Sequence, residues 1–538
     1  MIELLAGTIT VKTRIYSRGY ARVLHLLLPC LLTFFTVSPL HSDNPSYGGT
    51  LNLATIDEPE TLNPVISQDT SATIVWELVF NSLTRVNERM EPVGDLAESW
   101  SVSGDGLTWR FNLKNGVLFH DGTELTAEDV VFTYNAIRNP KLKSPKASYL
   151  AIIESVEAEG RYTVVFKLKS PYASFPYLTN MEILPARNFR ILGTSHRSFG
   201  EFPVGTGPFI FDSREKGVIV LRANERYFEG RPYIDRVVVK VYPSRESAWV
   251  ALLRGEIHLF GDVSWEDYRF ISDDPGFIVQ NYSSVFYYTL LFNIDDHLFK
   301  NREMRIAIDY AIDREDLVEI VLHGHGVPTT GPFMPGTWPY NPGVTAQQYR
   351  PEKSMTILDN AGWKDTDGDL IREKDGEELT IPLLIPGGDI IFEETAKRIK
   401  WHLFQVGIFA DIKVVSLKDF FEKHILPGDF KAALIPFNTG TLPKKGISTF
   451  WHSDSIGRTN YARYRSGDLD RLVDASVTVT DQAEREKLFY RIHRIIAEDR
   501  PAVFLYFRKR YLAVSSKVGG VKIIPQDLYH SVKEWYIK

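Results

Sequence analysis

The residues with the most obvious potential for chemistry lie in the stretch Val117–Phe132, where a histidine stands among several acidic side chains. His120 is followed directly by Asp121, and such a pair could act in general acid–base catalysis or bind a metal ion. Thr126, however, precedes Asp129 with the spacing of a capping box, which marks the start of a helix. The stretch therefore predicts a turn followed by a helix, and it does not indicate a catalytic site.

A second acidic stretch, Asp365–Glu378, resembles a calcium-binding loop. Asp365, Asp367 and Asp369 occupy alternate positions, as the first ligands of such a loop do. A leucine replaces the glycine expected at the sixth position, and a glycine replaces the glutamate expected at the twelfth. The three aspartates are therefore a calcium candidate. The alternative, which these departures favour, is an acidic hairpin exposed to solvent.

The common signatures of catalysis are absent from the sequence, which has no HExxH motif, phosphate-binding loop, nucleophile elbow or dinucleotide-binding glycine pattern. The single cysteine, Cys30, lies in an apolar run near the N-terminus, so we expect neither thiol catalysis nor disulfides. His323 and His325 could chelate a divalent metal, but the glycines around them suit a loop that ends a helix. We therefore expect no enzyme and no cofactor.

Length and composition narrow the class of protein. A chain of 538 residues is too long for one hydrophobic core, which predicts at least two lobes. The content of 44% hydrophobic and 24% charged residues is that of an ordinary globular protein. The net charge of −6 gives no electrostatic reason to bind nucleic acid, which would require a basic surface.

The N-terminus has the pattern of a secretory signal. Basic residues precede the apolar run Val23–Val37, and small residues follow it near Ser42. The run is short for a membrane-spanning helix, although an uncleaved anchor is an alternative. Cys30 is a poor candidate for lipid attachment, because more apolar residues follow it. We expect a signal peptide over residues 1–42, cleaved to release a periplasmic protein.

Strands and helices are expected to be mixed along the chain. Gly48–Thr55 alternates apolar and polar residues and predicts a strand, whereas the apolar stretch Tyr287–Ile294 predicts a strand in a sheet interior. Asn301–Gly324 predicts a long amphipathic helical region, and Glu393–Ile408 a further helix. No linker divides the chain. These features predict an α/β protein whose lobes share strands.

Several blocks of the sequence resemble solute-binding protein family 5, the exported receptors of ABC importers for peptides, nickel and related solutes. The strongest is Leu96–Tyr134, which reads LAESWSVSGDGLTWRFNLKNGVLFHDGTELTAEDVVFTY. Others follow the same order as in the family and cover nearly all of the chain after the leader. They are Gly48–Pro64, Val204–Phe209, Leu221–Ser244, Arg302–Glu315 and Asn460–Phe507.

The resemblance implies a two-lobed, periplasmic-binding-protein-like α/β fold with mixed sheets, hinge strands and an extra subdomain in the first lobe. A monomeric receptor would capture a peptide or peptide-like solute between the lobes and deliver it to an ABC permease and its ATPase. The expected boundaries are 43–275 for lobe 1 with a subdomain at about 88–200, 276–499 for lobe 2, and 500–538 for a return to lobe 1. A sensing or holding role on the same fold is an alternative, and an exported hydrolase is the least favoured one.

The sequence departs from the resemblance in Ala432–Trp451. Peptide-binding relatives carry an aspartate in this region that pairs with the α-ammonium of the peptide. Here the region has no carboxylate, and Asn438 and Thr439 stand about where the aspartate would be. Because a buried ammonium without a counter-charge is costly, we expect N-blocked peptides, anionic solutes or oligosaccharides to bind better than peptides with a free amine. The alternative is a shifted alignment, in which a nearby carboxylate fills the role.

The resemblance also points to ligand-contacting residues in loops that face the cleft of relatives. Amides would exchange hydrogen bonds with the solute, and aromatic rings would stack on it. For each aromatic residue, packing in a core is the alternative. The candidate residues are Asn293, Trp338, Asn438, Thr439 and Trp451, with Tyr461 behind them.

Overall fold

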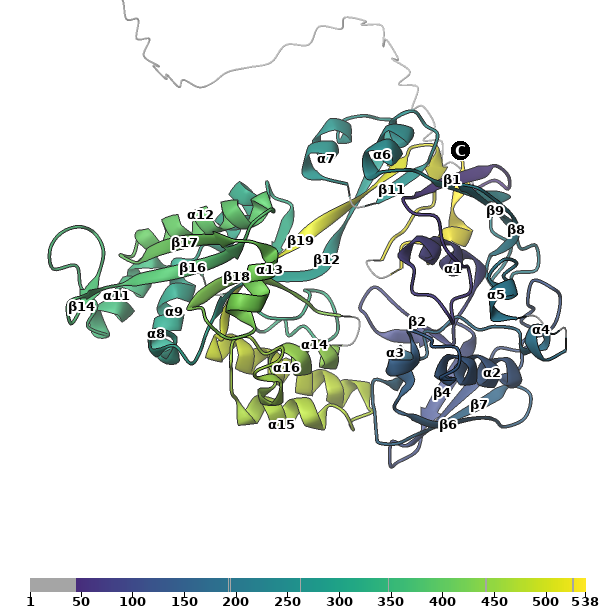
Figure 1. The fold of residues 1–538 in the computed structure, drawn as a ribbon, viewed down its shortest axis with the longest axis horizontal. Coiled ribbons are helices and arrows are strands. Elements are labelled where there is room, and N and C mark those ends of the chain that lie inside the picture. The colour runs from purple at the N-terminus through teal and green to yellow at the C-terminus, as the bar shows by residue number, and fades with distance from the viewer. Residues whose placement is uncertain are drawn as a thin grey trace, which may run out of the picture. The chain divides into compact units, whose positions relative to one another are not determined.

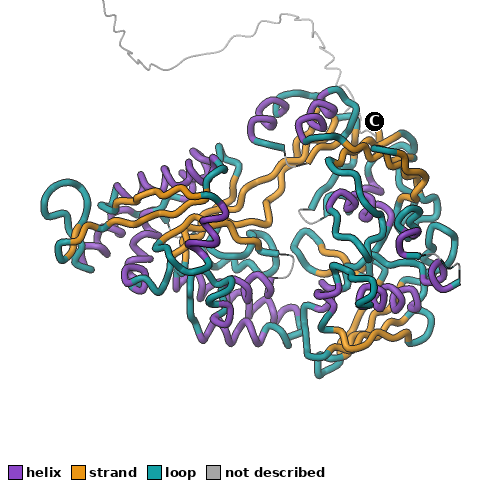
Figure 2. The backbone as a smooth tube through the Cα atoms, viewed as in Figure 1, coloured by secondary structure: helices purple, strands orange, loops and turns teal. Residues whose placement is uncertain are grey.

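The structure is a computed structural model and describes residues 45–538 except 192, 194, 262, 347, 441, 442, 525 and 526. The signal peptide expected over residues 1–42, including Cys30, lies outside the described residues. Within the part of the chain that is described, no helix is both long and apolar enough to cross a membrane. Three larger sheets contain most of the described strands, which are orange in Figure 2.

The N-terminal strand β1 belongs to a four-stranded sheet. It pairs in parallel with its neighbour, and the remaining pairs are antiparallel. Leu51 and Leu53 are buried in the core and alternate with less buried residues, which confirms the strand predicted here. The order is β1 (Thr50–Thr55), β10 (Arg236–Val241), β9 (Val218–Ala223) and β8 (Phe209–Glu215).

A second four-stranded sheet is antiparallel throughout, and helix α2 (Ala127–Arg138) packs on it. The N–H of Thr126 donates to the Asp129 carboxylate at 2.8 Å, so the capping box and the helix start predicted there are confirmed. The order is β4 (Ala97–Val102), β5 (Thr108–Leu113), β7 (Thr163–Leu168) and β6 (Ile153–Ala158).

His120 has a structural role before this helix. Its Nδ1 accepts from the N–H of Gly205 at 3.3 Å, and its Nε2 lies 3.0 Å from the carbonyl oxygen of Gly207. Burial lowers the pKa of His120 to about 4, so the ring is neutral at pH 7. The predicted turn at this position is confirmed, and the histidine anchors a distant loop.

The largest sheet contains the strand predicted to be interior, β12, which lies between β19 and β18. Short strand β13 (Gly326–Pro328) pairs with β19 beside it. The order is β11 (Leu259–Gly261), β19 (Ala502–Ser515), β12 (Phe277–Phe292), β18 (Ala432–Asn438), β16 (Thr380–Pro386) and β17 (Phe409–Val415).

Strands β12 and β19 run side by side (Figure 1), and β19 contributes to more than one core. Leu512 and Val514 pack in the core of the two four-stranded sheets. Val503 and Leu505 of the same strand pack in a core formed with the helices of the largest sheet. The predicted α/β fold with shared strands is therefore confirmed.

The helices around the largest sheet follow the apolar periodicity of the sequence, with one break. The region predicted to be helical after Asn301 is interrupted at Ile312, because the carboxylate of Asp313 accepts from the N–H of Asp316 and starts a new helix. The helices here are α8 (His297–Lys300), α9 (Arg302–Ala311), α10 (Arg314–Asp316) with a π-helical turn (Leu317–Val321), α11 (Pro351–Asn360), α12 (Ile390–Phe404), α13 (Leu417–Asp419) with a π-helical turn (Phe420–Ile425), α14 (Pro443–Phe450), α15 (Gly467–Ala475) and α16 (Gln482–Asp499).

Shorter elements complete the fold. Among them, helix α1 (Thr73–Val79) and hairpin strand β2 (Thr84–Val86) matter for the site described below. The others are β3 (Pro92–Gly94), α3 (Phe175–Leu178), α4 (Ala186–Arg190), α5 (His196–Phe199), α6 (Arg245–Leu253), α7 (Trp265–Ile271), β14 (Glu373–Lys374), β15 (Glu377–Glu378), β20 (Val518–Gly519), β21 (Tyr536–Ile537) and 3-10 turns at Thr70–Ala72, Ala147–Leu150, Ser453–Ser455 and Val532–Glu534.

Candidate functional site

Two cavities share part of their walls. The first, called the Asp527 cavity, has a volume of about 160 Å³ and is lined by residues of α1, β2 and the C-terminal segment. The second, called the Tyr282 cavity, has a volume of about 440 Å³ and is lined by residues of β11, β12 and β19. Because Glu77 and Tyr529 line both cavities, the two adjoin along this pair.

Glu77 reaches the cavities from an otherwise apolar helix. Its neighbours Trp76 and Leu78 are buried in the core, and the indole N–H of Trp76 donates to the carbonyl oxygen of Leu62 at 3.0 Å. These contacts fix the helix and leave Glu77, on a different face, beside both cavities. The position of this carboxylate therefore follows from the packing of the helix that carries it.

Most charged groups of the Asp527 cavity have partners. Arg85 and Lys533 lie 3.6 Å and 3.3 Å from the carboxylate oxygens of Glu229. The buried carboxylate of Asp95 accepts from the N–H of Ser82 at 2.9 Å. Burial raises the pKa of Asp95 to about 6, although the positive charge of Arg85 opposes this.

Glu77 and Asp527 are the exceptions. The carboxylate of Glu77 accepts no hydrogen bond from any described residue and forms no ion pair with one, whereas that of Asp527 accepts from the N–H of Tyr529 at 3.2 Å. Burial and the negative charge of Asp527 raise the pKa of Glu77 well above its usual range. Burial also raises the pKa of Asp527. Two half-buried acidic groups thus line the same cavity, close enough for the charge of Asp527 to act on Glu77, and either a proton or a cation would relieve the repulsion.

The Tyr282 cavity adds positive charge. Arg245 and Arg510 line it together with the ring of Phe260, over which the Arg245 guanidinium lies at 5.1 Å from the centroid. Arg245 also donates to the carbonyl oxygen of Gly261 at 3.1 Å. Both adjoining cavities therefore present acidic and basic groups, and the Tyr282 cavity contributes the guanidinium groups of Arg245 and Arg510.

Four of the six predicted contact residues lie close to Phe437, at the end of β18. The rings of Trp451 and Tyr461 lie 5.6 Å and 6.2 Å from its ring, centroid to centroid. Asn438 and Thr439 follow it directly, and Asn438 is exposed. Trp451 is fully buried, and its indole N–H donates to the hydroxyl of Tyr287 at 3.0 Å.

The other two predicted residues lie elsewhere. Trp338 is 1% exposed, and its indole N–H donates to the hydroxyl of Tyr177 at 2.9 Å. Asn293 is buried and donates to the carbonyl oxygens of Gly428 and Phe430, both at 3.0 Å. None of the six lines the Asp527 or the Tyr282 cavity. Contact of these six residues with a ligand stays a prediction.

The acidic pair in the Asp527 cavity was not predicted from the sequence. A glutamate inside the apolar helical pattern around Trp76 and Leu78 was a signal, because acidic residues are rarely placed against a core without a reason. Asp527 has no comparable local signal. It reaches Glu77 only because the end of the chain returns to the N-terminal sheets.

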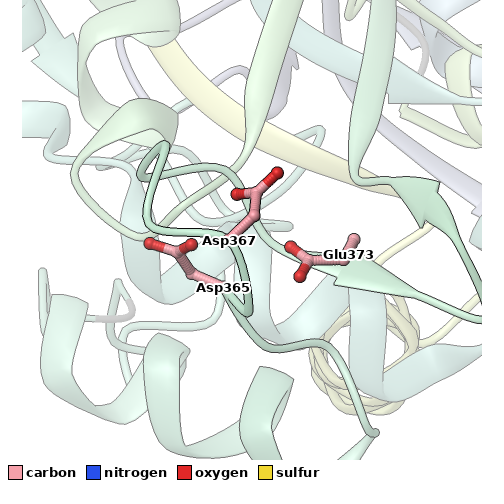
Figure 3. Close-up of side chains that lie close together, drawn as sticks. All are labelled: Asp365, Asp367 and Glu373. Carbon is pink, nitrogen blue, oxygen red and sulfur yellow. The ribbon is translucent and has the colours of Figure 1, made fainter.

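The acidic loop forms the predicted hairpin, with strands β14 and β15 paired. Carboxylate oxygens of Asp365, Asp367 and Glu373 lie within 4.8 Å of one another (Figure 3), and the first two residues are exposed. Asp369 is outside this group, and its carboxylate accepts from the N–H of Ile371 at 2.8 Å. Glu373 thus takes the place predicted for Asp369, and calcium binding by this loop stays a prediction.

The histidine pair noted in the sequence packs against an aromatic ring. The rings of His323 and His325 lie 4.9 Å and 4.2 Å from that of Trp265, and Nδ1 of His325 is hydrogen-bonded to the hydroxyl of Tyr511. Gly324 between them has a positive φ of 81°, as a loop that ends a helix requires. These contacts favour the loop interpretation.

A mixed α/β fold whose cores share long strands, with cavities beside those strands, fits the class of extracellular solute-binding proteins. Residues 91–458 match the family model described as bacterial extracellular solute-binding proteins, family 5 Middle. The chain belongs to this family, which is a class of receptors. The family expected from the sequence is thereby confirmed.

The relatives include proteins with bound peptides. The oligopeptide-binding protein AppA of Bacillus subtilis (strain 168) is 33% identical over 506 residues, which are 92% of this chain and 93% of AppA. The AppA structure in complex with a nonapeptide matches with a TM-score of 0.62 and 32% identity, over 92% of this chain and 100% of that one. DppA from Helicobacter pylori, in complex with the peptide STSA, matches with a TM-score of 0.62 and 25% identity, over 92% and 99%. HbpA2 from Haemophilus parasuis shares the fold, with a TM-score of 0.79 and 23% identity over 91% and 100%.

Proposed function

We propose that the protein is the peptide receptor of an ABC importer, which captures a peptide between its lobes and hands it to a membrane permease and its ATPase. The observation that carries this proposal is the match to AppA, a peptide-binding protein, over nine-tenths of both chains. The peptide-bound DppA structure supports the same ligand class. A non-peptide solute and a sensing or holding role are less favoured.

The proposed mechanism is reversible closure without chemistry on the ligand. A peptide that contacts both lobes stabilises the closed arrangement and so shifts the population towards it. The shared strands β12 and β19 are the hinge in this proposal, with lobe 1 over 43–275 and 500–538 and lobe 2 over 276–499. The subdomain at about 88–200 belongs to lobe 1.

The proposed location is outside the cytoplasm. The leader at residues 1–42 would be cleaved, and the mature chain would act as a periplasmic monomer. An N-terminus mapped to residue 43 by mass spectrometry would support release, and an intact leader would support tethering.

Calorimetry with a di- to pentapeptide library tests the function on the purified mature chain. We expect saturable binding of several peptides, and a smaller radius of gyration by small-angle scattering when peptide is present. Absence of binding by every peptide would contradict the proposal, as would scattering that does not change at saturation. Native mass spectrometry of the freshly purified protein would report the mass of any solute retained from the cell.

A further inference from the structure

The Asp527 cavity contains five described carboxylates, and most of them are already neutralised. Glu229 has Arg85 at 3.6 Å and Lys533 at 3.3 Å, and Glu182 has Lys146 at 2.6 Å. A third, Asp95, accepts the hydrogen bond from the N–H of Ser82 described above. The described ion pairs of the cations that line the cavity are therefore made with acids other than the central pair, although the charges of Arg85 and His530 also act on Asp527.

Glu77 and Asp527 form no ion pair with a described residue, and no positive group opposes the raised pKa of Glu77, whereas His530 and Arg85 partly offset that of Asp527. Each carries a pKa raised by burial, and the charge of Asp527 adds to the effect on Glu77. Enclosed carboxylates are normally matched by a positive group, since an uncompensated buried charge is strongly unfavourable. A cation supplied from outside would complete this arrangement.

The shape of the cavities limits what such a cation can be attached to. At about 160 Å³ the Asp527 cavity accommodates an amino group and the residue that carries it, but not an extended chain. The Tyr282 cavity, of about 440 Å³, continues from Glu77 and Tyr529 towards Arg245 and Arg510. A longer molecule can therefore place its positive end beside Glu77 and run on towards groups that suit carbonyl or carboxylate oxygens.

We infer that Glu77 and Asp527 bind the ammonium group of the ligand from the side of lobe 1, which makes peptides with a free amine the preferred substrates. The inference rests on the proposed peptide receptor. It replaces the expectation drawn from Ala432–Trp451, because the missing carboxylate of that region has two counterparts across the chain. The ammonium is that of the peptide N-terminus or of a lysine side chain, which share the same chemistry.

The test compares matched peptides on the purified mature chain by calorimetry. One tetra-alanine carries a free N-terminus, a second is N-acetylated, and a third is N-acetylated with one alanine replaced by lysine. The proteins are the unmodified chain, Glu77→Gln, Asp527→Asn and, as a matched control, Glu98→Gln, since Glu98 is exposed on β4. Melting temperatures show that each variant is folded.

We expect the unmodified chain and Glu98→Gln to bind the free-amine peptide at least tenfold more tightly than the acetylated one. The substitutions Glu77→Gln and Asp527→Asn should reduce the ratio of the two affinities to near one. The melting temperature of each variant should be unchanged or higher. If the acetylated peptide that contains lysine binds as tightly as the free-amine peptide, the group bound at this site is the side-chain ammonium of lysine. Equal binding of free and acetylated peptides by the unmodified chain overturns the inference but leaves the peptide receptor in place. Failure of all three peptides and of the mixed library overturns both.

Discussion

The indole N–H of Trp338 donates to the hydroxyl of Tyr177 at 2.9 Å, although the two residues are 161 positions apart. The backbone N–H of Trp338 also donates to the carbonyl oxygen of Arg89 at 3.1 Å. Arg485, which is 2% exposed, donates to Ser174 at 2.7 Å beside the same indole. These contacts join the proposed lobes away from the hinge strands.

Substituting phenylalanine for Trp338 should weaken this junction. The variant loses a buried hydrogen bond and part of a fully packed ring, so we expect the free energy of unfolding to fall by about 1–3 kcal/mol in urea denaturation. Trp401→Phe is the control, because Trp401 is 46% exposed and its loss should cost about 0.5 kcal/mol or less. Equal losses in the two variants would show that the contact adds little to stability.

Acid should destabilise the protein through His120. The pKa of His120 is about 4 in the folded state, against 6.5 for the free group. The neutral ring is therefore favoured by folding, and its contribution to the free energy of unfolding is complete above about pH 6.5 and is lost as the pH falls towards 4. The difference corresponds to about 3 kcal/mol for this residue. Urea denaturation at pH 7.5 and 4.5 measures the loss.

The variant His120→Gln should show a smaller difference between the two pH values. Burial also lowers the pKa of His493 to about 4, so His493 accounts for part of the difference in stability that remains in this variant. His297→Gln is the control, because the side chain of His297 is 76% exposed. If the His120→Gln variant loses as much stability between pH 7.5 and 4.5 as the unmodified chain, the ring of His120 is not the group that titrates.

The capping carboxylate of α2 should be important for stability. Asp129 accepts from the N–H of Thr126 and from that of Ala186, both at 2.8 Å, so Asp129→Ala leaves two donors without a partner. We expect a loss of about 1–3 kcal/mol in the free energy of unfolding. Glu128→Ala removes only an exposed ion pair with Arg190 and should cost at most about 1 kcal/mol. A larger loss of stability for Glu128→Ala than for Asp129→Ala would contradict the role of Asp129 as the capping residue of α2.

Binding of a free-amine peptide should release protons. Burial raises the pKa of Glu77 and of Asp527, the charge of Asp527 raises that of Glu77 further, and an ammonium bound beside them favours their ionised forms. Glu182, Arg85, His530 and the other charged groups of the cavity modulate the size of the effect. The heat of binding at pH 6 should therefore change with the ionisation enthalpy of the buffer for the free-amine peptide. For the acetylated peptide it should be the same in every buffer. Agreement for both peptides would argue against ammonium binding here.

Local features of the fold could be predicted because neighbouring residues encode them. The capping residues Thr126 and Asp129 are three positions apart, and the apolar run around Tyr287 cannot face water on either side. The interruption at Asp313 was missed, because its capping carboxylate competes with an amphipathic pattern that continues past it.

The candidate site was harder to predict, because it depends on contacts between distant segments. Glu77 could be noted as an acidic residue in an apolar helix, but its counterpart Asp527 is brought near it only by the fold. The contact residues carried over from the family were chosen by position in the chain. That choice gives no information on whether a ring such as Trp338 ends in a core or beside a cavity.

The core of the N-terminal sheets contains Leu51 near one end of the described chain and Trp535 near the other. Between them the polypeptide leaves this core to build the largest sheet and comes back through β19. A ribosome must therefore complete nearly the whole protein before this first core can close. In the export proposed for this chain such an order is an advantage, because a polypeptide whose first core cannot close until its last residues are made stays unfolded long enough to pass through a membrane channel.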